Sequence, residues 1–401
     1  MKHKNTAYID REAMASNYRA IKDLTAKEAA EAGLKAPAVI CVVKADAYGH
    51  GIKTTADVLG GAGCGFFAVS SEEEADELRR IEAENGRHPE ILILGHIDPE
   101  NVGEMIEDDV TCAVVSAENA DVLADAARKY RAAHTDAKPL KIHIKLDTGM
   151  NRVGFPTDDA HASETADIIA GISKLGDLRL CGIFTHFSCA DDELMDGKKV
   201  DGYADGYTAM QLGRYKRILS LLKERGVDPG VRHAANSAAV LKLPAAYFDA
   251  VRAGVILYGL MPNGSIDERF LPVMKMCSTV THIHRIEKGE KISYGATFEA
   301  DKPMTVATVA AGYADGFERA YSGCEVTING RKFRQIGRIC MDQFMVDITG
   351  DDGVKVGDEV TLFGGDNGES VANLARRAGT INYEVVCKVS KRVLRDGGEM
   401  T

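Results

Sequence analysis

Long apolar runs, basic clusters and paired cysteines are all missing from this chain of 401 residues, and each absence excludes a class of protein. No stretch approaches the ~20 consecutive apolar residues of a membrane span. The first ten residues, MKHKNTAYID, lack the apolar core of a signal peptide. Lys and Arg are nowhere concentrated in a run, and the net charge is −11. We therefore expect no nucleic-acid partner and no membrane association.

The nine cysteines are odd in number, irregularly spaced and without a CxxC pair, and Cys41 and Cys181 lie in apolar stretches. They are expected to be reduced, mostly buried thiols of a cytoplasmic protein. Metal-ligand spacing is also absent. His282 and His284 alternate on a predicted strand, which indicates a pleated face rather than a metal site. The sequence therefore predicts no bound metal.

The composition, 45% hydrophobic and 27% charged, indicates a soluble globular protein long enough for two domains with one large core. In the first part of the chain, short apolar stretches alternate with helical patterns, two of which begin at Ser71 and Ser116. Eight strands with intervening helices predict an α/β fold, a TIM-like (β/α)8 barrel. The predicted strands are Ala38–Val43, Phe66–Val69, Ile91–Leu94, Cys112–Val115, Lys141–Leu146, Leu178–Phe184, Val231–Ala234 and Phe248–Arg252.

The pattern changes near residue 271, where strand-like stretches follow one another without helices between them. Asn329-Gly330 is a two-residue hairpin signal, so this part is predicted to be mainly antiparallel β. We place a barrel domain at residues 12–266 and a C-terminal β domain at residues 267–401. The polar segment Cys189–Gly206 is predicted to be a surface loop. The predicted strands are Val273–Ile286, Met304–Ala311, Glu325–Ile328, Lys332–Ile336 and Glu359–Phe363.

Lys44 directly follows the first predicted barrel strand, Ala38–Val43. The carboxyl ends of barrel strands hold the catalytic groups of such folds. A lysine half-buried there has a lowered pKa and can form a Schiff base. From these residues alone, a lysine that merely leads the chain out to solvent is the favoured interpretation, because lysines are common at strand ends.

Nine motifs carry a family resemblance. VVKADAYGHG, around Lys44, resembles the pyridoxal-phosphate (PLP) lysine segment of alanine racemases. Eight more follow in the family's order: KLDTGMNRVG (145–154), THFS (185–188), HAANSA (233–238), RAGVILYG (252–259), SYGATF (293–298), GYADGF (312–317), GRICMDQF (337–344) and NYEVVCKVSKRV (382–393). The resemblance spans nearly the whole chain. It implies a PLP-dependent racemase of fold type III that interconverts L- and D-alanine and supplies D-alanine for peptidoglycan.

The resemblance implies a two-base mechanism. Lys44 carries PLP and is one base, and Tyr294 is the other. A tyrosine with an ordinary pKa near ~10 needs cations or hydrogen bonds to act as a base near neutral pH. His186 and Arg252 are the candidates for that help. Arg252, oriented by His233, is also implied to bind the pyridine nitrogen, which stays largely unprotonated because arginine keeps its proton.

The cofactor's phosphate needs hydrogen-bond donors. Asn236-Ser237 opens a predicted helix whose free N–H groups suit an anion, although Asn236 could equally be only a helix cap. The other implied donors are the backbone N–H groups of Gly254 and Val255 and the hydroxyls of Tyr48 and Tyr383.

The substrate contacts are also implied by the resemblance. Arg152 resembles the arginine that contacts the phenolic oxygen of PLP and the substrate carboxylate. Lys145 matches a lysine that is often carbamylated in the family, where its carboxylate holds that arginine. Met341 matches a residue whose backbone touches substrate, and it is surrounded by Tyr313, Cys340 and Asp342.

The resemblance further implies how the chains assemble. In the family, Tyr294, Tyr313 and Cys340–Asp342 serve the active site of the other subunit. This implies a head-to-tail homodimer with composite sites. It also implies that the first strand, within residues 1–11, packs on the C-terminal domain.

Alternative functions remain at this point. One is a serine or broad-specificity racemase, although Tyr383 resembles the tyrosine that restricts the pocket of alanine enzymes. A PLP decarboxylase would be expected to have an acidic residue where Arg252 stands. A non-catalytic PLP-binding protein, from a different class, would lack the second domain. A barrel hydrolase would need paired carboxylates at strand ends, and no convincing pair is present.

Overall fold

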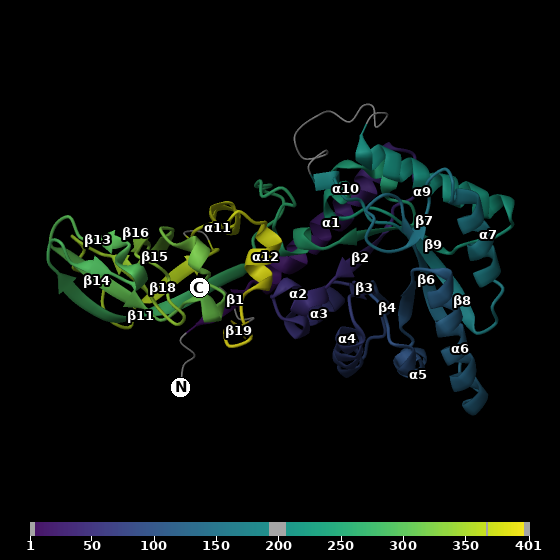
Figure 1. Ribbon diagram of the computed structural model, residues 1–401, viewed down its shortest axis with the longest axis horizontal. Coiled ribbons are helices and arrows are strands. Elements are labelled where there is room, and N and C mark those ends of the chain that lie inside the picture. The colour runs from purple at the N-terminus through teal and green to yellow at the C-terminus, as the bar shows by residue number, and fades with distance from the viewer. Residues whose placement is uncertain (1–4, 192–205, 366–367, 397–401) are drawn as a thin grey trace. The chain divides into compact units, whose positions relative to one another are not determined.

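A computed structural model describes residues 5–191, 206–365 and 368–396 (Figure 1). Parallel pairing runs through β2, β3, β4, β5, β6, β8, β9 and β10 and returns to β2, so eight strands form a closed barrel. The predicted (β/α)8 barrel is confirmed. The strands are β2 (Ala38–Val42), β3 (Phe66–Val69), β4 (Glu90–Ile93), β5 (Thr111–Val114), β6 (Leu140–Asp147), β8 (Leu178–Phe184), β9 (Val231–His233) and β10 (Ala250–Ala253), with a short β7 (Phe155–Pro156) beside β6.

Helices follow the strands, and two of them begin at the predicted caps. The hydroxyl oxygens of Ser71 and Ser116 accept the N–H groups of Glu74 and Asn119. No helix in the described ranges is long and apolar enough to cross a membrane. Residues 192–205 of the predicted polar loop lie outside the described residues. The helices are α1 (Arg11–Glu31), α3 (Ile52–Gly61), α4 (Glu72–Glu84), η1 (Pro99–Asn101), α5 (Val102–Glu107), α6 (Ala117–Ala133), α7 (Ala162–Ile172), α9 (Tyr207–Glu224), α10 (Ser237–Lys242), η2 (Pro244–Ala246) and η3 (Val255–Tyr258).

The C-terminal part is mainly antiparallel, as predicted. Its long strand β11 (Met274–Ile286) pairs with β1 (Thr6–Ile9), β18 and β14, and six strands close in the order β11-β14-β17-β16-β15-β18. Asn329 and Gly330 turn the β15–β16 hairpin with φ of +50° and +76°. The remaining elements are β12 (Lys291–Ile292), η4 (Tyr294–Ala296), β13 (Phe298–Glu299), β14 (Met304–Val309), η5 (Tyr313–Asp315), η6 (Arg319–Tyr321), β15 (Glu325–Ile328), β16 (Arg331–Ile336), β17 (Phe344–Asp347), β18 (Glu359–Phe363), α11 (Val371–Ala378), α12 (Asn382–Cys387) and β19 (Leu394–Asp396).

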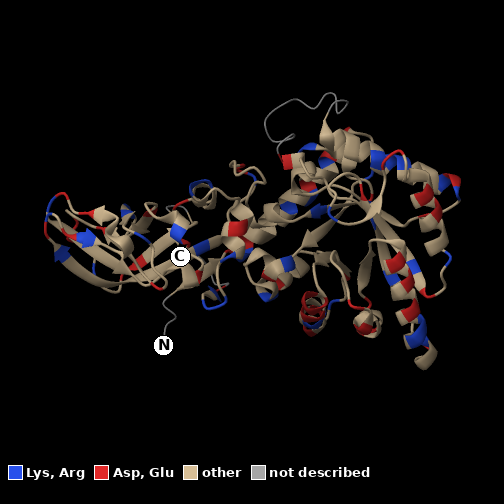
Figure 2. Cartoon of the chain, viewed as in Figure 1, with Lys and Arg blue, Asp and Glu red and all other residues tan. Residues whose placement is uncertain are grey.

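The described residues divide into two compact units. One comprises residues 17–45 and 56–257, which hold the barrel strands, and the other comprises the remaining described residues. The segment 46–55 therefore belongs with the C-terminal strands although it directly follows the first barrel strand. β1 also belongs there, because it lies between β11 and β19 in the sheet. Charged residues of both signs occur along the outer helices (Figure 2).

The short helix α2 (Lys44–Tyr48) is left-handed. Its residues from Ala45 to Tyr48 have φ between +51° and +55°. Each L-residue in this conformation costs roughly 1–2 kcal/mol, because the Cβ atom approaches the next carbonyl oxygen. None of the four is glycine, so the surrounding structure must hold the turn.

Hydrogen bonds hold this turn in place. The His50 ring Nδ1 lies 3.1 and 3.0 Å from the carbonyl oxygens of Ala47 and Tyr48. Burial lowers the pKa of His50 to about 4, so its ring is neutral and Nδ1–H donates to both. The carboxylate of Asp46 accepts the N–H of Ile52 at 2.7 Å. The turn therefore fixes the direction in which the chain leaves Lys44.

A glycine at position 45 should relieve this strain. Ala45 is exposed with φ +54°, so Ala45→Gly should raise the free energy of unfolding by about 0.5–1 kcal/mol. The same change in right-handed α6, Ala126→Gly, should lower it by about 1 kcal/mol. Thermal unfolding of both variants measures the difference. Equal destabilisation by the two substitutions would contradict a strained turn at Ala45.

Candidate active site

The barrel residues predicted for catalysis converge at the carboxyl ends of the strands. Half-buried Lys44 follows β2, and His186 follows β8. Lys145 lies near the end of β6, His233 ends β9, and Arg252 lies on β10. Because the strands are parallel neighbours in one barrel, their side chains meet at the same end, where barrel enzymes carry their chemistry.

Arg252 is the most completely fixed of these side chains, with 3% of its surface exposed. Its Nη1 donates to His233 Nδ1 (2.9 Å) and to the His233 carbonyl oxygen (3.1 Å). Its Nη2 donates to the carbonyl oxygens of Thr185 (2.6 Å) and Ala234 (2.9 Å). The Nε–H donates to no group in the described ranges. Burial lowers the pKa of Arg252 to about 10, which still leaves the guanidinium charged at neutral pH.

His186 lies within reach of several cations. Its Nδ1 is 3.5 Å from Arg252 Nη2. Burial first, and then the charges of Arg252, Arg152, Lys145 and Lys44, hold the pKa of His186 well below its usual value. The structure therefore brings these five residues together. A neutral His186 can donate a hydrogen bond but supplies no charge.

Lys145 is a buried amine beside other cations. Its Nζ donates to the Leu146 carbonyl oxygen at 2.6 Å and lies 5.7 Å from the centre of the Phe184 ring. Burial, Arg252 and Arg152 lower the pKa of Lys145 to about 7, against the opposing effect of Asp147. A large fraction of this lysine is therefore an uncharged, nucleophilic amine at neutral pH.

In the structure, Asn236 is the N-cap residue of helix α10. Its Oδ1 accepts the N–H of Ala239 at the start of α10 (3.2 Å), and its Nδ2 donates to the Phe187 carbonyl oxygen (3.4 Å). The Ser237 hydroxyl accepts the N–H of Gly254 (3.0 Å). These contacts join the start of α10 to the end of β10, directly before Val255 opens η3.

The two tyrosines predicted to bind phosphate lie close together in the other unit. The ring of Tyr48 lies 6.1 Å from that of Tyr383 and 5.3 Å from that of Tyr258, measured between centroids. Burial raises the pKa of Tyr48. Its phenol therefore stays protonated and keeps its O–H for donation.

Three further predicted residues lie on the surface of that unit. Tyr294 is 68% exposed, Met341 53% and Tyr313 44%. Large apolar side chains grouped at a surface are typical of an interaction site. The N–H of Tyr313 donates to the Cys340 carbonyl oxygen (3.1 Å), and Asp342 accepts a hydrogen bond from Arg392 (2.7 Å).

Three chain segments are fixed together behind this exposed group. The Ser293 hydroxyl donates to the Arg338 carbonyl oxygen (2.6 Å) and lies 3.5 Å from Cys340 Sγ. Position 312 must be glycine, because a Cβ there would lie 2.3 Å from the carbonyl oxygens of Cys340 and Met341. The segments 293–295, 312–316 and 338–342 are therefore built as one surface.

Sequence reasoning missed three residues that hold the barrel site. The Phe184 ring stacks on His233 with centroids 5.0 Å apart and lies 5.5 Å from the guanidinium carbon of Arg252. Thr185 supplies a carbonyl to Arg252. His143 lies 3.0 Å from His233. A signal was available for His143 alone: it precedes Lys145 by two residues on one strand, so both point to the same face.

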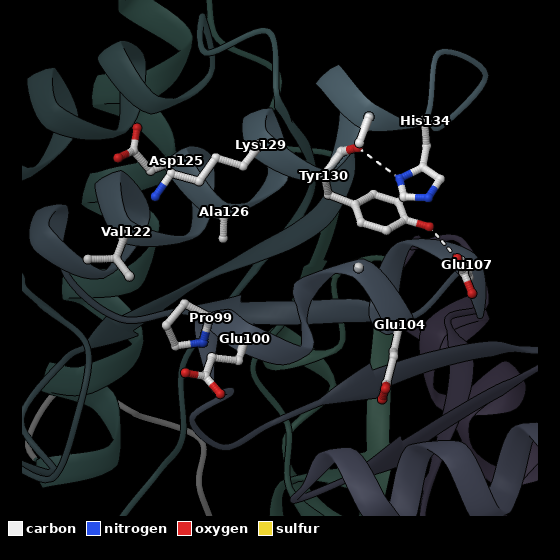
Figure 3. A pocket seen from close by; sticks show the side chains of 12 residues that line it. Pro99, Glu100, Glu104, Glu107, Val122, Asp125, Ala126, Lys129, Tyr130 and His134 are labelled. Carbon is white, nitrogen blue, oxygen red and sulfur yellow. Dashed lines mark hydrogen bonds between the residues drawn. The ribbon is translucent and has the colours of Figure 1, made fainter.

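Two other features contain none of the predicted site residues. A pocket of about 700 Å³ lies between η1, α5 and α6 on the outer surface of the barrel unit (Figure 3). Tyr130 donates a hydrogen bond to Glu107 at its edge. The rings of His282 and His284 stack 5.1 Å apart on β11. Among the described residues, no group of three or more His, Cys, Asp or Glu side chains could hold a metal ion.

Comparisons with known proteins agree with this arrangement. Family models match residues 9–262 (alanine racemase, N-terminal domain) and 273–396 (alanine racemase, C-terminal domain). The chain is 39% identical to the alanine racemase of Clostridium novyi over 97% of this chain and 94% of that protein. It is 37% identical to that of Methanococcus maripaludis over 98% of both.

Solved structures are equally similar. An alanine racemase of Clostridium difficile 630 in complex with cycloserine superposes with a TM-score of 0.82 at 35% identity, covering 98% of this chain and 95% of that one. The matched motifs, the two matched domains and the shared fold together show that this chain belongs to the alanine racemase family.

Proposed function

We propose that this chain is a PLP-dependent racemase that interconverts L- and D-alanine, with Lys44 and Tyr294 as the two acid–base groups. The observation that carries the proposal is the engagement of Arg252, whose remaining donor, Nε–H, suits the acceptor nitrogen of a pyridine ring. Arginine does not give up its proton, so this nitrogen would stay largely unprotonated. Weak electron withdrawal favours simple proton exchange over decarboxylation.

The donor set fits PLP. Lys44 would hold the cofactor covalently, and PLP, when bound, supplies the electron withdrawal that makes the α-proton of alanine acidic. Arg152 would orient the substrate carboxylate, and the backbone of Met341 would touch the substrate, with Tyr313, Cys340 and Asp342 around it. The phosphate would be held by Tyr48, Asn236, Ser237, Gly254, Val255 and Tyr383.

Lys44 and Tyr294 would move protons on opposite faces of the substrate. One lysine cannot readily reach both faces, so the second group must come from elsewhere. Arg252 can stabilise the Tyr294 phenolate by its charge, and His186 can do so by a hydrogen bond because its ring is neutral. Tyr383 would restrict the space beside the substrate, which favours alanine over serine.

Removing the Lys44 amine should abolish racemisation. Lys44→Ala should lower D-alanine formation from L-alanine by at least ~10³-fold, since a base and the covalent attachment are lost together. Lys53→Ala, an exposed lysine on α3, is the matched control and should keep full activity. A chiral assay with L-alanine and L-serine in parallel makes the measurement. Preference for L-serine would support the serine racemase alternative instead.

We further propose that Lys145 carries a carbamate. The neutral amine attacks the carbon of CO₂ and forms an N–C bond. The π electrons of one C=O bond move onto its oxygen, which gives the carboxylate, and the amine loses a proton to solvent. The new anion would lie among Arg152 and Arg252, where an ammonium group would be repelled. The lowered pKa of Lys145, about 7, supports this reaction at neutral pH.

Loss of the Lys145 carbamate should be partly reversible. Lys145→Ala should reduce activity by about 10–100-fold, the usual cost of losing a residue that orients a site group. Added acetate or formate should restore part of it, whereas Lys44→Ala should show no rescue. With ¹³C-bicarbonate, the wild type should give a carbamate carbon signal that Lys145→Ala lacks. Full activity of Lys145→Ala without this signal would rule the carbamate out.

We also propose a head-to-tail homodimer. Tyr294 is 68% exposed within its own chain, and Tyr313 and Met341 are exposed as well, which supports a surface that a second copy of the chain covers. In this arrangement Tyr294, Tyr313 and Cys340–Asp342 complete the site of the other subunit.

Mixing two inactive variants tests the shared site. A heterodimer of Lys44→Ala and Tyr294→Phe has one site with both groups intact, so each heterodimer should regain up to about half the activity of a wild-type dimer. The measurement is activity after subunit exchange that is verified by mass spectrometry. No recovery in exchanged heterodimers would place both groups in one subunit.

We also propose that the protein is cytoplasmic. Most of the nine cysteines are buried, which supports a reducing compartment such as the cytoplasm, where thiols stay reduced. Disulfides found in protein isolated from its native cells would contradict this.

We take residues 12–266 as the barrel domain and residues 267–401, with strand 1–11, as the β domain, which the pairing of β1 with β11 supports. Limited proteolysis should cut near residue 266.

In a cell-wall-forming organism, the product would be D-alanine for peptidoglycan, and loss of the gene should create a D-alanine requirement.

A further inference from the structure

His143 continues the hydrogen-bonded chain that begins at Arg252. It lies on β6, is 2% exposed, and its Nδ1 is 3.0 Å from Nε2 of His233. His233 in turn holds Arg252 Nη1 through Nδ1. The strand opposite makes room for the His143 ring, because a Cβ on Gly182, its register partner, would lie 2.4 Å from it.

Only one arrangement of protons satisfies this chain. A guanidinium can only donate, so His233 Nδ1 accepts from Arg252. A neutral His233 then carries its proton on Nε2 and donates it to His143 Nδ1. His143 must therefore carry its own proton on its Nε2. Burial and neighbouring cations keep both rings neutral, with the pKa of His143 lowered to about 3 and that of His233 well below its usual value.

The acceptor on His143 matters because His233 has a second neutral form. With its proton on Nδ1, His233 would point a donor at a donor of Arg252. His233 can adopt this Nδ1-protonated form once His143 no longer accepts a hydrogen bond from the Nε2 of His233. The Arg252 guanidinium would then lose one of the two contacts on Nη1 and could rotate about its own axis.

We propose that His143 is a positioning residue of the active site, which selects the tautomer of His233 that accepts a hydrogen bond from Arg252 and so holds the guanidinium in place. The role in catalysis rests on the proposed function, since Arg252 acts there on the pyridine nitrogen. The selection of the tautomer does not depend on the cofactor or on the reaction.

A pair of variants of similar size separates the hydrogen bond from packing. His143→Leu removes the acceptor, and His143→Asn replaces Nδ1 with a side-chain oxygen in nearly the same place. Ile144→Val, the next residue of β6, alters buried volume without a hydrogen bond and serves as a packing control.

The first readout is ¹⁵N NMR of histidine-labelled protein without cofactor. In the wild type, both His233 and His143 should carry the proton on Nε2. In His143→Leu, the His233 signals should shift toward the Nδ1–H form, while His143→Asn and Ile144→Val should keep the wild-type pattern. A wild-type His233 protonated on Nδ1, or a His143→Leu spectrum with His233 unchanged, would overturn the proposal. If His143→Leu does not fold, the wild-type and His143→Asn spectra still decide.

The second readout is steady-state kinetics of the PLP-loaded enzyme. His143→Leu should lower kcat about tenfold with little change in KM, as expected for one lost hydrogen bond to a charged group, and His143→Asn should recover most of it. A catalytically inactive wild type would refute the proposed function and leave the NMR result standing. A tautomer change with unaltered kcat would overturn the catalytic part of the proposal.

Discussion

The buried guanidinium of Arg252 governs this site. Among the described residues Arg252 forms no ion pair, and its charge is accommodated by three backbone carbonyls and one imidazole. Burying a charge is tolerated only when its hydrogen bonds are satisfied. Here the bonds come from strand ends β8 and β9, so the barrel itself fixes the arginine.

The charge of Arg252 also sets the protonation of its neighbours. His233, His186 and Lys145 all have a lowered pKa, and Arg252 contributes to each after burial. The arginine keeps its proton because its ordinary pKa is far higher than theirs. The result is a buried permanent cation, Arg252, beside two neutral histidines and a lysine that is partly uncharged. These groups can donate, accept or react without adding more positive charge.

Much of the fold could be predicted from the sequence because its signals are local. Phe66–Val69 is a continuous apolar stretch and Leu178–Phe184 is mostly apolar, as is typical of a parallel sheet, and the structure has both with the predicted limits. β17 was missed because Phe344–Asp347 is short and begins on the last residue of the motif GRICMDQF, which contains charged side chains. The left-handed turn after Lys44 could not be foreseen, since Ala45, Asp46, Ala47 and Tyr48 give no glycine signal for positive φ.

The candidate site was predictable only in part, for a related reason. The family motifs named Arg252 and His233, but nothing local links His143 to His233, which lies 90 residues away. The sequence left Asn236 as either a phosphate-binding residue or a helix cap, and the structure shows its cap hydrogen bond to Ala239. Contacts between distant strands depend on register, which one sequence does not specify residue by residue.

The protonation state of the cofactor's ring nitrogen shows whether Arg252 keeps its proton beside the pyridine. PLP labelled with ¹⁵N at the pyridine nitrogen, bound to the wild-type protein, should give the chemical shift of an unprotonated nitrogen that accepts a hydrogen bond. This is expected because Arg252 would donate from Nε in the proposed complex and, with a pKa of about 10, retains its proton at neutral pH. A protonated pyridine nitrogen in the wild-type protein would contradict the account.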